Sequence, residues 1–173
     1  MILQYHKGKI IKLISGGQVG SDSGGLAGAF DLQIETGGMA PKGYRTRWGT
    51  EPRLAKLGLI ESDSVEYKPR TFWNVENSDG TVRFAYDFTS AGEICTLRAI
   101  KKYKKPHFDI QLKDLEDGNF LIYDILDWFK KYDIKILNVA GNAGENKKQS
   151  TKIFSLVRKN LKLWIQKYNE GES

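Results

Sequence analysis

The order of apolar and polar positions predicts short strands that alternate with helices. Apolar runs at 10–14, 81–86 and 134–140 have the length and the β-branched content of strands. Each run ends in a turn of small or polar residues, and helical spacing of apolar residues follows it. The first helix pairs Leu26 with Phe30, the second covers 91–104, and the third repeats apolar residues from 153 to 168. A further strand at 106–110 and a helix near 120–131 separate the second unit from the third.

This alternation predicts an α/β fold: a Rossmann-like, three-layer arrangement with a mainly parallel sheet and helices on both faces. We expect a single domain over 1–173, because no repeat or low-complexity tract divides the chain. Ligands of such sheets bind beyond the carboxyl ends of the strands, and the three turns all belong to that edge. The glycine-rich segment 36–51 is predicted to be a long functional loop.

Composition narrows the class of protein. The chain has 27 basic and 21 acidic residues, a formal net charge of +6. The excess favours an anionic partner but does not choose between a phosphorylated ligand and nucleic acid. Cys95 is the single cysteine, so an internal disulfide is excluded and a reducing compartment is favoured. The sequence shows neither a signal peptide nor a membrane span, which predicts a cytoplasmic protein without a membrane partner.

The turn at 15–22 is the first candidate site. Its glycines allow backbone N–H groups to face an anion, and the following helix adds the positive end of its dipole. The turn lacks the Gly-Lys-Ser/Thr ending of a Walker A loop and the spacing of a dinucleotide fingerprint. Tight strand-to-helix packing explains the glycines equally well, and Asp22 has an alternative role as a first-turn carboxylate.

The other two turns add polar groups at the same edge. In 89–93, Ser90 and Glu93 have the spacing of a capping box, although Glu93 could instead accept hydrogen bonds from ribose hydroxyls. The turn 138–144 carries amide side chains, and Lys147 follows it. Arg47 and Trp48 of the long loop could pair with a phosphate and stack on a base. The candidate ligand-binding residues are Ser15, Gly16, Gly17, Gln18, Val19, Gly20, Asp22, Lys42, Arg45, Thr89, Ser90, Gly92, Asn138, Gly141, Asn142 and Lys147.

Catalytic motifs are scarce. The two histidines, His6 and His107, do not form metal-ligand spacing, and no nucleophile-elbow motif occurs. We therefore expect no metal site. The remaining candidates for catalysis are the carboxylates of Asp22 and Glu93, so the sequence favours a binding protein and leaves an enzyme open.

Several segments together resemble a known family. The run Ile14-Ser15-Gly16-Gly17-Gln18-Val19-Gly20-Ser21-Asp22 is similar to the I-S-G-G-Q-T-G-x-D opening of proteins called putative molybdenum carriers, the circularly permuted YpsA group of the SLOG superfamily. The resemblance continues through 37–43, 70–75, 78–81 and 137–141, in order along most of the chain. It implies a SLOG-type Rossmann-like fold. The wider superfamily includes sensors of nucleotide-derived signals in antiviral defence and phosphoribohydrolases.

The chain departs from that family pattern at three positions. Ser23 replaces an arginine after the motif aspartate, Gly92-Glu93 replaces Gly-Thr, and Asn142-Ala143 replaces Pro-Arg. Two cations that are usual at the ligand edge are therefore absent. The P-G-G-x-G-T-x-x-E motif of the phosphoribohydrolases is also absent, which weakens the enzyme hypothesis.

The leading hypothesis is a carrier or sequestering protein for a phosphorylated, nucleotide-derived small molecule. An ADP-ribose-type immune signal and a molybdopterin are two concrete versions, and the cofactor itself stays unidentified. The alternatives are a phosphoribohydrolase-like hydrolase and a nucleic-acid-binding protein. Nucleic acid ranks last, because the lysine clusters contain few aromatic residues for base stacking. A homo-oligomer is possible for such folds, but no segment of the sequence predicts an interface.

Overall fold

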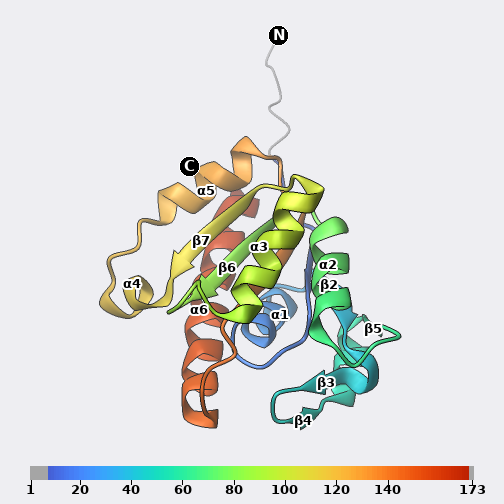
Figure 1. The fold of residues 1–173 in the computed structure, drawn as a ribbon. Coiled ribbons are helices and arrows are strands. Elements are labelled where there is room, and N and C mark those ends of the chain that lie inside the picture. The colour runs from blue at the N-terminus through green and yellow to red at the C-terminus, as the bar shows by residue number, and fades with distance from the viewer. Residues whose placement is uncertain (1–7, 172–173) are drawn as a thin grey trace.

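The computed structural model describes residues 8–171 and has a six-stranded parallel sheet at its centre (Figure 1). The strand order is β5-β2-β1-β8-β6-β7. In sequence order the strands are β1 (Lys12–Ser15), β2 (Glu35–Ala40), β5 (Leu59–Glu61), β6 (Gly80–Ala85), β7 (His107–Gln111) and β8 (Ile136–Gly141). A separate two-stranded hairpin joins β3 (Arg45–Thr46) to β4 (Gly49–Thr50).

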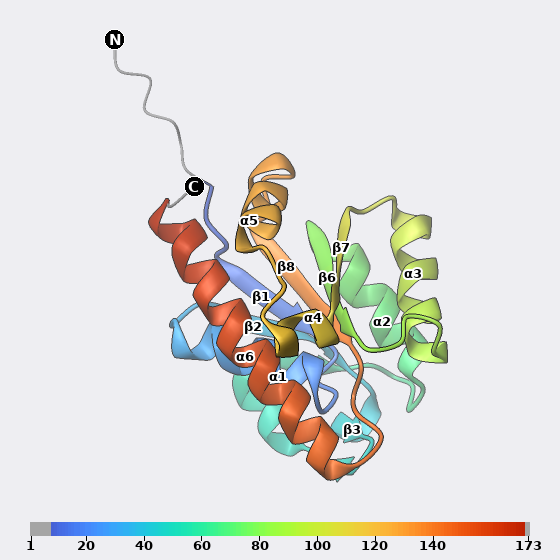
Figure 2. The same cartoon turned by 90° about the vertical axis from the view of Figure 1, so that its left-hand side faces the viewer.

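Helices cover both faces of the sheet, so the three-layer Rossmann-like α/β prediction is confirmed. One layer contains α1 (Ser21–Asp31), α4 (Leu112–Asp117), α5 (Ile122–Lys131) and the long α6 (Lys147–Glu170). The other layer is formed by α2 (Tyr67–Glu76) and α3 (Ala91–Tyr103), which pack against each other (Figure 2). Two short 3-10 helices, Lys42–Tyr44 and Pro52–Leu57, connect β2 to β5. Among residues 8–171, no helix has the length and apolarity needed to cross a membrane.

The core explains why the central strands are so apolar. Every residue of β6 is buried, because helices cover it from both sides and neighbouring strands flank it. Phe84 of β6 stacks on Trp164 of α6 at a centroid distance of 6.0 Å, which ties the sheet to that helix. Leu13 and Val139 lie buried on the adjoining strands.

The segment 36–51 differs from the expected loop. Its first five residues belong to β2, which pairs in parallel with β1 and β5. The glycines there serve close packing: a Cβ on Gly38, whose φ is +119°, would lie 2.2 Å from the carbonyl oxygen of Ser15. The rest of the segment forms the short 3-10 helix and the β3–β4 hairpin.

The topology brings the three predicted turns together. From β1 the chain builds the sheet in one direction through β2 and β5, and from β6 it builds in the other direction to β7. β8 lies between β1 and β6 and pairs with both. The carboxyl ends of these three strands are therefore neighbours at the point where the connections diverge, which is where such sheets bind ligands.

Candidate functional site

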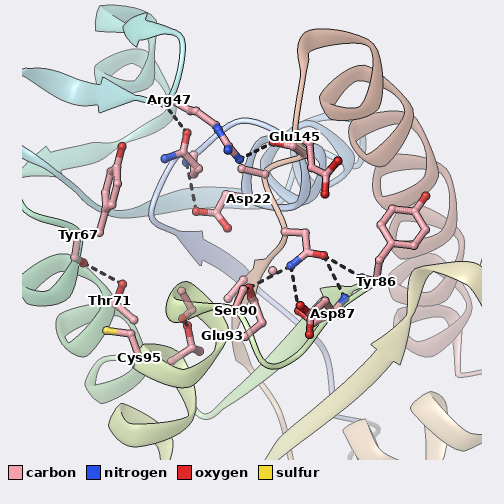
Figure 3. Close-up of a pocket in the computed structure, with 18 of the residues that line it drawn as sticks. Asp22, Arg47, Tyr67, Thr71, Tyr86, Asp87, Ser90, Glu93, Cys95 and Glu145 are labelled. Atoms are coloured by element: carbon pink, nitrogen blue, oxygen red, sulfur yellow. Dashed lines mark hydrogen bonds between the residues drawn. The ribbon is translucent and has the colours of Figure 1, made fainter.

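A pocket of about 450 Å³ opens at the carboxyl ends of the central strands (Figure 3). Residues of α1, of the β3–β4 hairpin, of the first turns of α2 and α3, and of the turn after β8 surround it. The lining comprises Gln18, Asp22, Arg47, Tyr67, Arg70, Thr71, Tyr86, Asp87, Ser90, Gly92, Glu93, Cys95, Thr96, Ala140, Gly141, Asn142, Ala143, Gly144, Glu145 and Gln149.

Two deeply buried carboxylates, Asp22 and Glu93, lie in this pocket. Their exposed fractions are 3% and 4%. Asp22 accepts a hydrogen bond from the backbone N–H of Gln18 at 3.1 Å. Burial nevertheless raises the pKa of Asp22 to about 6, against the opposing charge of Arg70. Glu93 accepts from the Ser90 hydroxyl at 2.7 Å and from the Asn142 amide at 3.0 Å, and burial raises its pKa as well.

Arg70 is the buried cation beside this pair. Only 13% of its side chain is exposed, and its Nη1 lies 3.5 Å from the Asp22 carboxylate. Its Nε is buried without a hydrogen-bond partner among the described residues. Gly16 makes room for the guanidinium, because a Cβ there would lie 1.9 Å from Nη1. The guanidinium also lies over the ring of Tyr67, 5.4 Å from the centroid. Arg70 thus has donors that its surroundings do not use.

The turn at 15–22 uses backbone N–H groups of its own for hydrogen bonds within the turn. The Gly17 N–H donates to Ser15 Oγ at 3.1 Å, the Gln18 N–H donates to Asp22, and the Val19 N–H donates to Gln18 Oε1 at 3.0 Å. Gly20 packs against the backbone of the turn after β8. The glycines of this turn therefore serve packing and internal hydrogen bonds, and the turn offers a ligand fewer donors than its sequence suggests.

The second turn differs from the predicted capping box. The Ser90 hydroxyl donates to the Glu93 carboxylate and makes no side-chain hydrogen bond to the N–H groups of α3. Arg83 of β6 stabilises the first turn of α3 by donating a hydrogen bond to the Glu93 carbonyl at 3.0 Å. A Cβ on Gly92 would meet no atom within 4 Å. The N-terminus of α3 thus faces the pocket without a side-chain cap and with open space before it.

The third turn is held by a network of hydrogen bonds. Asn142 accepts from the N–H of Tyr86 at 2.8 Å and donates to Glu93, which ties the turn after β8 to the turn after β6. Arg47 of the hairpin donates to the Gly144 carbonyl at 2.5 Å, so the hairpin lies against the same turn. Trp48 donates to Ser150 at 3.3 Å and does not line the pocket.

The structure brings part of the predicted set to the pocket. Gln18, Asp22, Ser90, Gly92, Gly141 and Asn142 line it, and so does Glu93. Ser15, Gly16, Gly17, Val19 and Gly20 form the turn behind it, Thr89 bonds to Asp87, and Asn138 is buried in the sheet against Thr81. Lys42, Arg45 and Lys147 are exposed and lie outside the lining.

Some lining residues were not among the predicted ones. Arg70 and Tyr67 come from α2, a helix that carries no glycine-rich turn to draw attention to it. Tyr86 follows directly on β6, and Glu145 and Gln149 flank the start of α6. Two signals were available: Tyr86 lies at a strand end, and Arg70 belongs to the segment 70–75 that resembles the family.

The charges of the lining limit what the site can do. Asp22, Asp87, Glu93 and Glu145 supply carboxylates, and Arg47 and Arg70 supply guanidinium groups. Such a mixture fits a ligand that carries both an anionic group and hydrogen-bond donors. Among residues 8–171, no three His, Cys, Asp or Glu side chains are grouped so that they could hold a metal ion.

The solved structure of a "Putative molybdenum carrier protein" from Syntrophus aciditrophicus SB is similar to this chain. The two share 33% sequence identity and superpose with a TM-score of 0.75, over 88% of this chain and 95% of that one. No protein of curated function matches the chain. The model of the circularly permuted YpsA SLOG family matches residues 13–163, the segment that contains every strand of the sheet except the first residue of β1. The chain therefore belongs to the circularly permuted YpsA SLOG family.

Proposed function

We propose that the protein binds a phosphorylated, nucleotide-derived small molecule in this pocket and holds it without chemical change. The observation that carries the proposal is the buried guanidinium of Arg70. Within residues 8–171 its Nε has no hydrogen-bond partner, and its Nη1 lies 3.5 Å from the Asp22 carboxylate. A buried donor without a partner is costly, and an oxyanion is the ligand that a guanidinium accommodates best.

The N-terminus of α3 supports the same ligand chemistry. Its N–H groups lack a side-chain cap, and Gly92 leaves open space in front of them. A phosphate placed there would receive backbone hydrogen bonds and the favourable helix dipole. Glu93 and Asp22 are the acceptors available nearby for ribose hydroxyls.

The name of the solved relative adds molybdenum to the ligands that deserve testing. The donors around the pocket are suited to molybdenum as an oxyanion or within a phosphorylated pterin, because both present oxygen atoms to Arg70 and to the α3 N-terminus. An ADP-ribose-type immune signal presents two phosphates and ribose diols to the same groups. The shared chemistry of these ligands is an oxyanion joined to hydrogen-bond donors.

Isothermal titration calorimetry tests the proposal with AMP, ADP-ribose, molybdopterin, molybdate and inorganic phosphate. We expect at least one phosphorylated organic ligand to bind, and Arg70→Met to weaken that ligand roughly tenfold or more. Arg53→Met is the matched control, because Arg53 is an exposed arginine outside the pocket. The proposal is abandoned if none of these ligands binds, or if the two variants weaken binding equally.

Hydrolysis of an N-glycosidic bond is the second candidate function. The observation in its favour is the pKa of Asp22, about 6, which is suited to proton transfer near neutral pH. In that reaction one carboxyl group protonates the departing base, the other accepts a proton from water, and the water oxygen bonds to the sugar carbon that the base leaves. Chromatography of AMP after incubation distinguishes the functions. Free adenine and ribose 5-phosphate, lost in Asp22→Asn or Glu93→Gln, would establish an enzyme.

A further inference from the structure

Tyr86 lines the pocket, and hydrogen bonds hold both its backbone and its hydroxyl group. Its backbone N–H donates to Asn142 at 2.8 Å. Its hydroxyl donates to Glu116 of α4, and Glu116 is itself paired with Lys152 of α6 at 2.8 Å and with Lys113 at 3.6 Å. The ring is partly buried against the main core. An aromatic face that is already immobilised can stack on a planar ligand with little further loss of side-chain entropy.

Tyr86 lies at one end of the pocket and Tyr67 at the other (Figure 3). Arg70 belongs to the Tyr67 end, because its guanidinium lies over that ring at 5.4 Å. The pocket therefore has the guanidinium of Arg70 at one end and the ring of Tyr86 at the other. A nucleotide has the same polarity, with its phosphate at one end and its base at the other.

Two polar side chains line the pocket on the Tyr86 side. Glu145 is exposed, and Figure 3 shows its carboxylate on the same side of the pocket as Tyr86. The Oε1 of Gln149 accepts from the Glu145 N–H at 2.6 Å, which fixes the amide orientation. The Gln149 amide nitrogen has no hydrogen-bond partner among residues 8–171. This corner therefore offers a carboxylate acceptor next to an amide donor.

Guanine is the base that uses this pair most fully. Its N1–H and 2-amino groups are adjacent donors that one carboxylate accepts together, and its O6 lies beside them as an acceptor for an amide. Adenine and cytosine offer a carboxylate a single amino group, and hypoxanthine lacks the 2-amino group. We propose that the pocket binds a guanine nucleotide, with the base stacked on Tyr86 and its N1–H and 2-amino groups bound by Glu145. This inference rests on the function proposed above.

The first test uses the wild-type protein and three ligands in calorimetry: GMP, IMP and ribose 5-phosphate. GMP should bind roughly a hundredfold more tightly than ribose 5-phosphate, because stacking contributes about tenfold and the contact of the 2-amino group about another tenfold. It should also bind roughly tenfold more tightly than IMP because of the 2-amino group. Equal affinities for GMP and IMP would overturn the guanine inference while leaving phosphate binding intact. If all three ligands fail to bind, the proposed function itself fails.

Variants of Tyr86 and Glu145 test which residue causes the preference for GMP over ribose 5-phosphate and which causes the preference for GMP over IMP. Tyr86→Ala should weaken GMP binding roughly tenfold and leave ribose 5-phosphate binding unchanged, which also shows that the variant is folded. Tyr86→Phe keeps the ring and leaves Glu116 paired with its lysines, so its GMP affinity should stay close to wild type. Glu145→Ala should reduce the ratio of GMP to IMP affinity to about one. An unchanged ratio of GMP to IMP affinity in Glu145→Ala, or an undiminished ratio of GMP to ribose 5-phosphate affinity in Tyr86→Ala, contradicts the assignment.

Discussion

The buried carboxylate of Asp22 lowers the stability of the folded protein when it is ionised. Its carboxylate is almost fully buried, and its contacts with the Gln18 N–H and with Arg70 do not offset the lost hydration, since its pKa is raised from 3.8 to about 6. An acid with a raised pKa favours the folded state less as it ionises. The burial of Asp22 is therefore not explained by a gain in stability, and a carboxylate with a raised pKa in a pocket is typical of a functional site.

Asp22→Asn should raise the free energy of unfolding at neutral pH. Between pH 3.8 and about 6 the folded chain holds a proton that the unfolded chain has released, so the stability contributed by Asp22 falls as pH rises through this window. Asp22→Asn lacks that loss. Its free energy of unfolding should therefore exceed that of the wild type by an amount that grows from near zero at pH 4 to roughly 2 kcal/mol at pH 7. Urea denaturation of both proteins from pH 4 to pH 7 measures it. An advantage that does not change with pH would contradict the explanation.

Gly92→Ala separates binding from folding at a single position. The added methyl group meets no atom within 4 Å and occupies space at the N-terminus of α3. Stability should be unchanged or higher, by up to about 1 kcal/mol, because alanine is the better helix former. Affinity for the nucleotide should fall about tenfold or more. Thermal denaturation and calorimetry measure the two effects.

Gly118→Ala is the steric control, because its Cβ also meets no atom within 4 Å and lies outside the pocket, at the C-terminus of α4. Its positive φ of 71° makes it lose some stability, but its ligand affinity should equal that of wild type. If Gly92→Ala also retains full affinity, the ligand does not approach the start of α3.

At the scale of elements, strong periodicity in the sequence was sufficient for most of the fold. The strands β1, β6 and β8 and the helix α3 were predicted close to their observed bounds, because buried apolar runs and helical spacing are local signals. The last helix was predicted from 153 to 168, and α6 begins earlier, at Lys147. β2 was not predicted, because its glycines suggested a loop; they are required by the close approach of β2 to β1. β5 has only three residues, so no periodicity could reveal it.

The candidate site was only partly predictable, for a physical reason. Strand-end turns are visible in a sequence, so Asp22, Glu93 and Asn142 were found. Arg70 reaches the pocket from α2, an element whose position depends on tertiary packing against α3. The use of N–H groups within the first turn was equally hidden, since it depends on where Ser15 and Gln18 direct their side chains.

The β3–β4 hairpin makes a prediction at this scale. Its two arginines differ in position: Arg47 lines the pocket and donates to Gly144, whereas Arg45 is exposed outside the lining. Arg47→Met should weaken nucleotide binding roughly tenfold, because a charged donor is lost beside the ligand. Arg45→Met should leave the affinity unchanged. Calorimetry on the two variants decides, and equal effects would mean that the hairpin contributes through its net charge alone.

The whole molecule has one main core that joins both ends of the described chain. The cluster extends from Ile10 to Tyr168 and includes residues of the sheet and of the α1–α6 layer. A smaller cluster of Val75, Ala99 and Ile100 joins α2 to α3. Because these two helices also close the pocket, their stability bears directly on binding.

We expect the whole chain to unfold in a single cooperative transition. The sheet passes through the entire core, so no layer can leave without exposing buried strands. Far-ultraviolet circular dichroism and tryptophan fluorescence should give coincident curves in urea, with equal calorimetric and van't Hoff enthalpies. An earlier transition in one probe would show that the α2–α3 layer is a separate folding unit.

The central place of β8 has a consequence for how the chain is made. β1 and β6 both pair with β8, yet β8 follows every other strand in the sequence. While the ribosome advances from the end of β6 at residue 85 to the start of β8 at residue 136, roughly 3 to 10 seconds pass at ordinary elongation rates. Once β7 is complete at residue 111, the nascent polypeptide carries two half-sheets, β5-β2-β1 and β6-β7, whose inner edges stay unpaired until β8 follows. Such unpaired strand edges can pair wrongly with strands of other nascent chains on the same messenger RNA. A holding chaperone that covers them until β8 emerges should therefore raise the yield of native protein more than one that acts after release.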